Sequence, residues 1–461
     1  MSAKPTKLLG MSLDDFDLLL SSGKELHLQP ARLIPFYKPG DEMAVTSIFL
    51  SALKLVNEFR DQIFRTIGFS RSKYIRMYTE AEFVLFERKR VDGLIIVIRG
   101  NKIIDALLLE VKNKSIELNE EQIQGYLGIA KAYGIPNLLT VSNQFVSFPT
   151  QSPLNIHIPK QVSTYHLSWS FILTIAHILL AENDNNISDT DQAEIMKEIV
   201  DYFESPNSGI LGFTQMKPGW IELTQKANAG ASLDVADSCV EDTVSSWLQE
   251  ERDMALILSR KLGILVKSGK IKFKNDLSAR VKYEKKALIS NRCLESTLQI
   301  DRAAAHLEIK AFFDRKNVEM SATINPPLDK KTRGQISWIR NQLKQSEKKN
   351  PDLFNSLVPE LFIEINLKFV KAPIRLHFNE LDSAADMIGA REIKSFSIMF
   401  LKFLGRKFES RKGVVQIIEE MLVNYYQGVL QHLKRWEKPV PQIIKTADAP
   451  EIIQPVSSVD S

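Results

Sequence analysis

The sequence is poor in cysteine and has no long apolar run. Its two cysteines, Cys239 and Cys293, are too few for a disulfide framework or a zinc site, and they suit a reducing cytoplasm. The longest apolar segment, 169–181, is interrupted by polar side chains and is too short to span a bilayer. Three acidic residues interrupt the apolar stretch within the first 20 residues, so no signal peptide is recognisable. We therefore expect a cytoplasmic protein without a membrane partner.

Strong net charge and nucleotide-binding loops are also missing. The 60 Lys and Arg residues face 56 Asp and Glu residues, so the formal net charge is only +4. Any nucleic-acid surface would therefore have to be a local basic patch. The absence of a Gly-rich phosphate loop or Walker pattern argues against an ATP-driven motor. What is present is 44% apolar residues over 461 positions, enough for about three folded domains.

Two apolar runs near residue 100 predict a β-hairpin. The runs, 94–98 and 106–111, flank the turn-prone segment 99–102. Each run has the length and the aliphatic composition of a buried strand. Charged residues lie at the open end of the hairpin, opposite the turn, where the first strand begins and the second strand ends.

These charged residues form a candidate metal site. Asp92 opens the first strand, and Glu110 and Lys112 close the second. Side chains alternate along a strand, so Glu110 and Lys112 share a face while Val111 points away, and pairing can bring Asp92 beside Glu110. Such charges are costly to desolvate unless something pairs with them. Mg²⁺, or Mn²⁺ in its place, prefers carboxylate oxygens and activates water for attack on phosphorus, which predicts a metal-dependent nuclease.

The triplet Glu-x-Lys alone is not specific, because the chain contains it five more times, starting at residues 87, 284, 308, 347 and 392. Context favours Glu110, which follows four apolar residues on a strand-like run and has an Asp-Gly pair at hairpin distance upstream. The main competitor is Glu308, since LEIKAFF is also strand-like and Asp301 lies upstream. The hairpin between those two residues would be too short to form comfortably.

The pattern Asp-(x)n-Glu-x-Lys resembles the signature of the PD-(D/E)XK nuclease superfamily. This resemblance implies that Asp92 and Glu110 hold the metal and that Lys112 orients or polarises the attacking water. We include Val111, between the last two, among the expected metal contacts. The proline of the signature is Val91 here, at a position that shapes the backbone rather than binding metal.

Three glutamates compete to complete the metal site. The segment 74–86 predicts a strand on which Glu80 and Glu82 are spaced to share a face, and we expect Glu80 to be the ligand. The alternative for Glu80 is an exposed strand carboxylate. Members of the superfamily often carry a metal-contacting glutamate on the helix before the sheet, and Glu58 lies on the amphipathic helix predicted over 41–67. A solvated glutamate is the alternative there.

A helix predicted over 121–133 carries two further candidates. Gln122 and Tyr126 are four residues apart and so lie on one helix face. The superfamily often has Gln-x-x-x-Tyr on the helix after the lysine strand, where the pair contacts phosphate or water. The resemblance therefore adds Gln122 and Tyr126 to the catalytic residues. The alternative is an N-terminal helix glutamine and a half-buried tyrosine.

The element order predicts an α/β N-terminal domain with the restriction-endonuclease-like arrangement of helix, three strands, helix and strand, followed by a helical module and a mixed α+β C-terminal half. The first 30 residues, with a short helix over 13–20, are expected to be a flexible lead-in or a small docking piece. The further divisions are the nuclease-like domain (31–158), a helical module (159–265), a small β-rich domain with a closing helix (266–350), an α+β region (351–437) and a disordered tail (438–461). Within the helical module, 163–180 predicts one helix, and a second is capped by Ser188.

Downstream segments are basic but lack a catalytic cluster. Lysines alternate with apolar residues in 270–274 and 279–283, which predicts short strands whose basic face suits a phosphate backbone. Lysines also protect exposed edge strands, which is the alternative. The segment 331–343 predicts a helix on which Trp338 lies among basic residues. A tryptophan on a helix is more often part of a core than a base-stacking platform.

Several segments together resemble a group of largely uncharacterised bacterial proteins sometimes labelled stress response proteins. They are ARLIP, TEAEF, RVDG, ALLLEVK and EQIQGYL between 31 and 127, and HLSWSFILT, SDTDQAEIMKEIVDYFESPNSG and KTRGQISWIRNQL between 166 and 343. The leading hypothesis is a Mg²⁺-dependent DNA nuclease acting in defence or repair, with a homodimer as a further expectation. The alternatives are an inactive nuclease-derived module that binds nucleic acid or protein, and a purely structural interaction protein.

Overall fold

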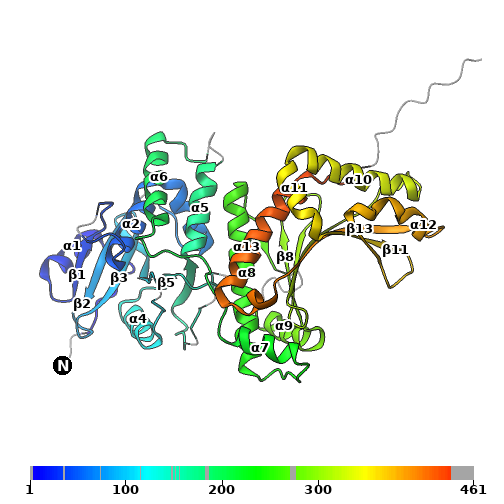
Figure 1. Ribbon diagram of the computed structural model, residues 1–461. Coiled ribbons are helices and arrows are strands. Elements are labelled where there is room, and N and C mark those ends of the chain that lie inside the picture. The colour runs from blue at the N-terminus through cyan, green and yellow to red at the C-terminus, as the bar shows by residue number, and fades with distance from the viewer. Residues whose placement is uncertain are drawn as a thin grey trace, which may run out of the picture.

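Two β-sheets organise the chain, and helices pack against both of them (Figure 1). The computed structural model describes residues 4–437 except 35–36, 73, 115, 147–148, 151, 155, 182–185 and 270–276. We call residues 4–204 the first lobe and residues 219–437 the second lobe, since each contains one sheet. The protein is therefore of the mixed α/β class, in agreement with the coarse prediction.

The first sheet has six strands in chain order, from β1 to β6. Strands β1 to β4 pair antiparallel, whereas β4, β5 and β6 run parallel. Parallel strands need a crossover, and a helix, α4, connects β4 to β5. The strands are β1 (Leu26–Pro30), β2 (Ile75–Phe83), β3 (Lys89–Arg99), β4 (Lys102–Val111), β5 (Asn137–Ser142) and β6 (Ser163–Ser168).

Helices cover both faces of this sheet, which explains the continuous apolar runs of β3 and β4. Leu94 and Leu108 face one core with α1 and α4, whereas Ile95 and Leu107 face another core with the remaining helices of the lobe. The helices are α1 (Leu13–Ser22), α2 (Glu42–Leu55), α3 (Asn57–Thr66), α4 (Glu120–Tyr133), α5 (Trp169–Ala181) and α6 (Thr190–Glu204).

The predicted hairpin is confirmed as β3 and β4. Gly100 and Asn101 at its turn both have left-handed backbone angles, with φ of 56° and 57°. Two such residues form the turn whose twist matches that of paired strands. The predicted strand over 74–86 and the predicted helix over 121–133 are confirmed as well, with ends shifted by a few residues.

Of the two alternatives for the first 30 residues, the docking piece agrees with the structure over the part described from residue 4, and the helix expected over 13–20 is α1. Helix α1 packs against the first sheet, and β1 extends that sheet by pairing with β2. Phe16 and Leu26 are fully buried there, so this segment supplies core rather than a loose arm. The prediction of a single helix over 41–67 is also wrong. Val56 leaves helical geometry, with φ of −109° and ψ of 104°, and separates α2 from α3.

The helix predicted over 163–180 begins only at Trp169. Residues 163–168 form β6, which pairs in parallel with β5 and so extends the first sheet beyond residue 158. Burial in the sheet decided this, because His166 and Leu167 lie among core residues although their sequence fits a helix equally well. The cap of α6 is Asp189 instead of Ser188, since its carboxylate accepts from two N–H groups of the first turn.

The second lobe is built on a seven-stranded antiparallel sheet in the order β12-β11-β13-β10-β9-β8-β7. This one sheet joins strands from both sides of residue 350. Its strands are β7 (Lys267–Ser268), β8 (Cys293–Gln299), β9 (Leu307–Phe312), β10 (Asn317–Ile324), β11 (Leu361–Leu367), β12 (Ile374–His377) and β13 (Ile393–Phe403). The helices of the lobe are α7 (Gly219–Asn228), α8 (Ser238–Leu262), α9 (Leu277–Asn291), α10 (Thr332–Lys349), α11 (Pro351–Leu357), α12 (Ala384–Ile388) and α13 (Arg411–Gly428).

Residues 279–283 lie within helix α9, so the strand predicted there is wrong. The reason is a buried ion-pair network. Arg280 contacts Glu284, one helical turn later, at 2.7 Å and Glu251 of α8 at 2.9 Å. An i, i+4 contact of this kind needs a helix. The lysine-rich segment 270–274 and the tail from 438 fall outside the described residues.

The two lobes share a continuous core, in which α8 and α13 lie between the sheets (Figure 1). Trp169 of the first lobe and Trp247 of the second belong to the same buried cluster. Among the helices of the described residues, none has the length and apolar character needed to cross a membrane.

Candidate metal centre

Strand pairing places Asp92 beside Glu110. Gly93 of β3 lies opposite Leu109 of β4. In an antiparallel pair the next two residues to face each other are therefore Asp92, before Gly93, and Glu110, after Leu109. Both carboxylates alternate onto the face of the sheet that carries α4. The hairpin geometry predicted from the sequence is therefore found in the structure.

Glu42, which the sequence analysis did not select, joins this pair. Ligand oxygens of Glu42, Asp92 and Glu110 all lie within 4.8 Å of one another, and no other group of three possible ligands is found among the described residues. The competing triplet at Glu308 therefore does not form such a group in the part of the chain that the structure describes. Three carboxylate oxygens at this spacing are a suitable set for a hard divalent cation.

Helix α2 presents Glu42 because its start is tied to the end of β4. Glu42 is the first residue of α2. The side-chain amide of Asn113 donates to the carbonyl oxygens of Gly40, at 2.9 Å, and Ser208, at 2.8 Å. These two bonds fix the chain just before the helix. The first turn of α2 is therefore held over the ends of the two central strands.

Lys112 lies between two of the carboxylates. Its Nζ is 2.7 Å from Glu42 Oε1 and 2.7 Å from Glu110 Oε1, and the side chain is only 10% exposed. The indole N–H of Trp169 donates to the Lys112 carbonyl oxygen at 2.9 Å, which fixes the backbone of Lys112. Burial by itself would lower the pKa of Lys112, but Glu110 and Asp92 outweigh it and raise that pKa. Lys112 is therefore a charged donor at neutral pH.

Val111 contributes its backbone to the site. Its N–H donates to Asp92 Oδ2 at 2.7 Å, while its side chain is buried in the core on the opposite face. This bond leaves the other oxygen of Asp92 for further contacts. The expected contact of Val111 with the site is thus a hydrogen bond to one of the candidate ligands.

Glu110 has a carboxylate oxygen without a hydrogen bond. It is fully buried, and its Oε2 has no hydrogen-bond partner among the described residues. Its Oε1 is within ion-pair distance of Lys112, although the geometry is not that of an aligned hydrogen bond. Burial and the charge of Glu110 raise the pKa of Asp92, and burial raises the pKa of Glu110. A bound cation would satisfy the free oxygen and offset the repulsion.

The helix pair Gln122 and Tyr126 faces the same site. Gln122 Nε2 donates to Tyr126 Oη at 2.7 Å, and Tyr126 Oη donates to the carbonyl oxygen of Arg90 at 2.8 Å. Burial and the nearby charge of Glu110 raise the pKa of Tyr126, so its hydroxyl stays protonated. The two side chains therefore reach from α4 to the start of β3, beside the carboxylates.

Glu80 lies beside the three-carboxylate group rather than in it. It forms an ion pair with Arg90 at 3.6 Å, and its backbone is left-handed, with φ of 51°. The register between β1 and β2 shifts at this point, which marks a bulge, a feature common next to functional sites. Burial raises the pKa of Glu80.

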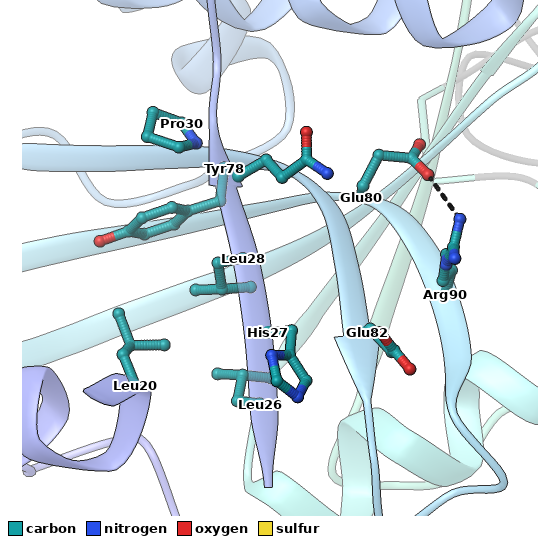
Figure 2. A pocket seen from close by; sticks show the side chains of 10 residues that line it. Leu20, Leu26, His27, Leu28, Pro30, Tyr78, Glu80, Glu82 and Arg90 are labelled. Atoms are coloured by element: carbon teal, nitrogen blue, oxygen red, sulfur yellow. Dashed lines mark ion pairs between the residues drawn. The ribbon is translucent and has the colours of Figure 1, made fainter. Parts of the chain in front are cut away.

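Glu80 and Arg90 form one side of an open pocket of about 550 Å³ at the β1 edge (Figure 2). Tyr78 and Leu28 line the apolar side, and Figure 2 shows Glu80 pointing toward Arg90 and away from them. Glu82 also lines the pocket and pairs with Arg88. The pocket lies on the side of β3 away from β4.

Glu58 does not reach the centre. Its carboxylate accepts hydrogen bonds from the N–H, at 3.1 Å, and the hydroxyl, at 2.8 Å, of Ser188, and so connects α3 to the segment before α6. The superfamily resemblance indicated a glutamate on a helix before the sheet, and Glu42 satisfies that description. Glu58 lies 16 residues after Glu42, which in a straight helix corresponds to roughly 24 Å, so even an unbroken helix would not bring both glutamates to the same centre.

Comparisons of the chain with protein-family models, with curated proteins and with solved structures found no match. The function is therefore argued from the chemistry of this site.

Proposed function

We propose that this protein is a divalent-cation-dependent nuclease that hydrolyses phosphodiester bonds in DNA. The observation that carries the proposal is the group of Glu42, Asp92 and Glu110, with a buried, unsatisfied carboxylate oxygen and a lysine among the acids. Carboxylates that converge on one point without enough positive charge are the ligand set of Mg²⁺ or Mn²⁺. A lysine beside such a set suits chemistry on a phosphate, where negative charge develops.

The residues of the site have separable roles. When bound, the cation would polarise a phosphoryl oxygen and supply an activated water. Asp92, Glu110 and Glu42 would hold it. Lys112, kept protonated by its neighbours, would orient the water or stabilise charge on the phosphate instead of accepting a proton. Gln122 would position Tyr126, whose hydroxyl lies beside the carboxylates and would have to leave the Arg90 carbonyl oxygen to donate to a bound phosphate or water.

A second function, an inactive module that binds nucleic acid, is supported by Lys112 itself. Its ammonium already contacts two of the three carboxylates and so removes part of the need for a cation. The test is incubation of the purified protein with circular single-stranded and double-stranded DNA in Mg²⁺ and in Mn²⁺. Cleavage supports the nuclease. Steeply salt-dependent binding without cleavage in either cation would support the module.

The proposal predicts that Glu42→Gln weakens Mn²⁺ binding on the order of 10- to 100-fold, because one carboxylate close to the ion is lost. Isothermal titration of the full chain measures this. Glu58→Gln is the matched control, since Glu58 lies in the first turn of the next helix but contacts Ser188 instead. Equal affinities for the parent and Glu42→Gln, or a loss in Glu58→Gln alone, would show that α2 contributes no ligand.

The stabilisation by Mg²⁺ should grow with pH. The folded-state pKa values of Asp92 and Glu110 are raised, so in the cation-free protein their contribution to stability is fully present below the ordinary carboxyl pKa. That contribution is lost as pH rises through the raised values. Bound Mg²⁺ replaces the protons. We expect the Tm difference between Mg²⁺ and EDTA samples to increase from about pH 5 to about pH 8. A difference that does not change over this range would contradict a cation at these carboxylates.

A further inference from the structure

Helix α10 in the second lobe carries two adjoining hollows that the proposed catalysis does not use. Their volumes are about 300 and 450 Å³, and they share Trp338, Gln342 and Gln345. The helix lies along the outer side of the second lobe, away from the first sheet (Figure 1). We call the two hollows together the α10 groove.

The lining residues follow one stripe of α10. Gly334, Trp338, Asn341, Gln345 and Lys349 are spaced by three or four residues and therefore lie on one side of the helix. At 1.5 Å per residue this stripe extends over roughly 20 Å. That length suits an extended chain rather than a small metabolite.

The C-terminal segment closes the second hollow. The side-chain amide of Gln342 donates to the Lys434 carbonyl oxygen at 3.0 Å and accepts from the Lys434 N–H at 2.6 Å. This reciprocal pair fixes the chain after α13 against α10. Gln431 and His432 complete the wall. The groove is therefore built from two segments held together and is not a loose surface feature.

The lining of the groove is basic. It includes Lys330, Lys349 and Lys434, and the described lining residues of both hollows include no acidic side chain. Burial and the charge of Lys349 lower the pKa of His432, so the basic character of the groove comes from its lysines. Polyanions are favoured there.

Several polar groups of the groove have no partner within the protein. The indole N–H of half-buried Trp338 and the exposed amides of Asn341 and Gln345 make no hydrogen bond within the described part of the chain. Trp338 packs partly against the core, and its exposed part lines both hollows beside amides and lysines. This arrangement offers the three contacts that unpaired nucleotides accept: stacking, base-edge hydrogen bonds and phosphate neutralisation.

We propose that the α10 groove binds single-stranded nucleic acid, with Trp338 stacking on a base, Asn341 and Gln345 bonding base edges, and the lysines contacting phosphates. Single strands are favoured over duplex because stacking on a side chain requires the face of an unstacked base. This site is distinct from the metal centre. Its binding is expected without any cation and in a protein that cannot cleave.

The test uses the full chain carrying Asp92→Asn, in EDTA, with a labelled oligothymidylate of about 15 nucleotides. Fluorescence anisotropy measures affinity. We expect Trp338→Ala to weaken binding on the order of tenfold, Trp338→Phe to retain most of it, and Lys349→Gln to reduce the salt dependence. Phe369→Ala, a fully exposed aromatic elsewhere in the same lobe, is the control and should change nothing.

Unchanged affinity in folded Trp338→Ala protein would overturn the proposal. So would duplex DNA that binds as tightly as the single strand, or polyglutamate that displaces the oligonucleotide equally well, because neither depends on a stacked base. Should Trp338→Ala fail to fold by circular dichroism, Gln345→Ala provides the same comparison at an exposed position. Because no cleavage is measured, the outcome is independent of the nuclease proposal.

Discussion

Asp92→Asn should abolish cleavage of DNA in Mg²⁺, with a loss on the order of 100- to 1000-fold or more, while it raises the Tm of the cation-free protein. Loss of one electrostatic group typically has a catalytic effect of this size. The stability gain has a different cause. Asp92 is held beside Glu110 with a raised pKa, so a neutral amide removes a repulsion that opposes folding. Thermal unfolding in EDTA and in Mg²⁺, together with a plasmid cleavage assay, measures both effects.

Asp105→Asn is the matched control for this prediction. Asp105 lies on the same hairpin, on β4, but accepts hydrogen bonds from Ser70 and Asn137 away from the metal centre. We expect this variant to cleave DNA like the parent. Parent-like cleavage by purified Asp92→Asn protein would exclude the assigned active site. If Mg²⁺ shifts the Tm of Asp92→Asn protein as much as that of the parent, the cation binds at a site other than this metal centre.

Lys112→Met should reduce cleavage by a factor similar to that of Asp92→Asn, but it should destabilise the cation-free protein instead of stabilising it. Lys112 is the ammonium that neutralises Glu42 and Glu110, each at 2.7 Å. Breaking a buried ion pair by removing one partner typically costs about 3–5 kcal/mol. The cation-free protein should therefore unfold at a lower temperature. Mg²⁺ should restore more stability than in the parent, because the cation then supplies the missing positive charge.

Asp92→Asn should raise the Tm of the cation-free protein and Lys112→Met should lower it, and these opposite effects make the pair of predictions specific. A lysine that only filled space would give a destabilised protein whose Mg²⁺ response equals that of the parent. Cleavage that remains within a few-fold of the parent in folded Lys112→Met would exclude its role at the phosphate. Lys89→Met, at an exposed position where β3 begins, is the control and should leave both measurements unchanged.

The hairpin and its charged residues could be predicted because the determinants are local. Strand alternation places Glu110 and Lys112 on one side. The Gly100-Asn101 turn and a one-residue shift of register between Val97 and Ile98 together bring Asp92 opposite Glu110. Helical spacing likewise predicts that Gln122 and Tyr126 share one face of the helix, whereas their place at the site was expected only from the superfamily resemblance. The role of Glu80 was less predictable, since its left-handed backbone is set by the pairing of β2 with β1.

Errors arose where long-range contacts decided between local alternatives. Residues 279–283 alternate like a strand, yet the burial of Arg280 against Glu251 and Glu284 requires a helix. The segment 163–168 fits a helix, yet a free edge beside β5 takes it into the sheet. In both cases the local preference was weak, and a buried contact outweighed it.

By itself, the sequence determined that Glu110 and Lys112 share a face and that Asp92 lies at the same end of the hairpin, because backbone alternation and turn geometry act over only a few residues. Only the tertiary structure set the exact register of Asp92 and brought Glu42 to the site. The position of Glu42 depends on Asn113, which fixes the chain at Gly40 and Ser208, two segments far apart in the chain. Contacts of that kind follow from packing, since no local pattern specifies which distant helix start will lie over the ends of the strands.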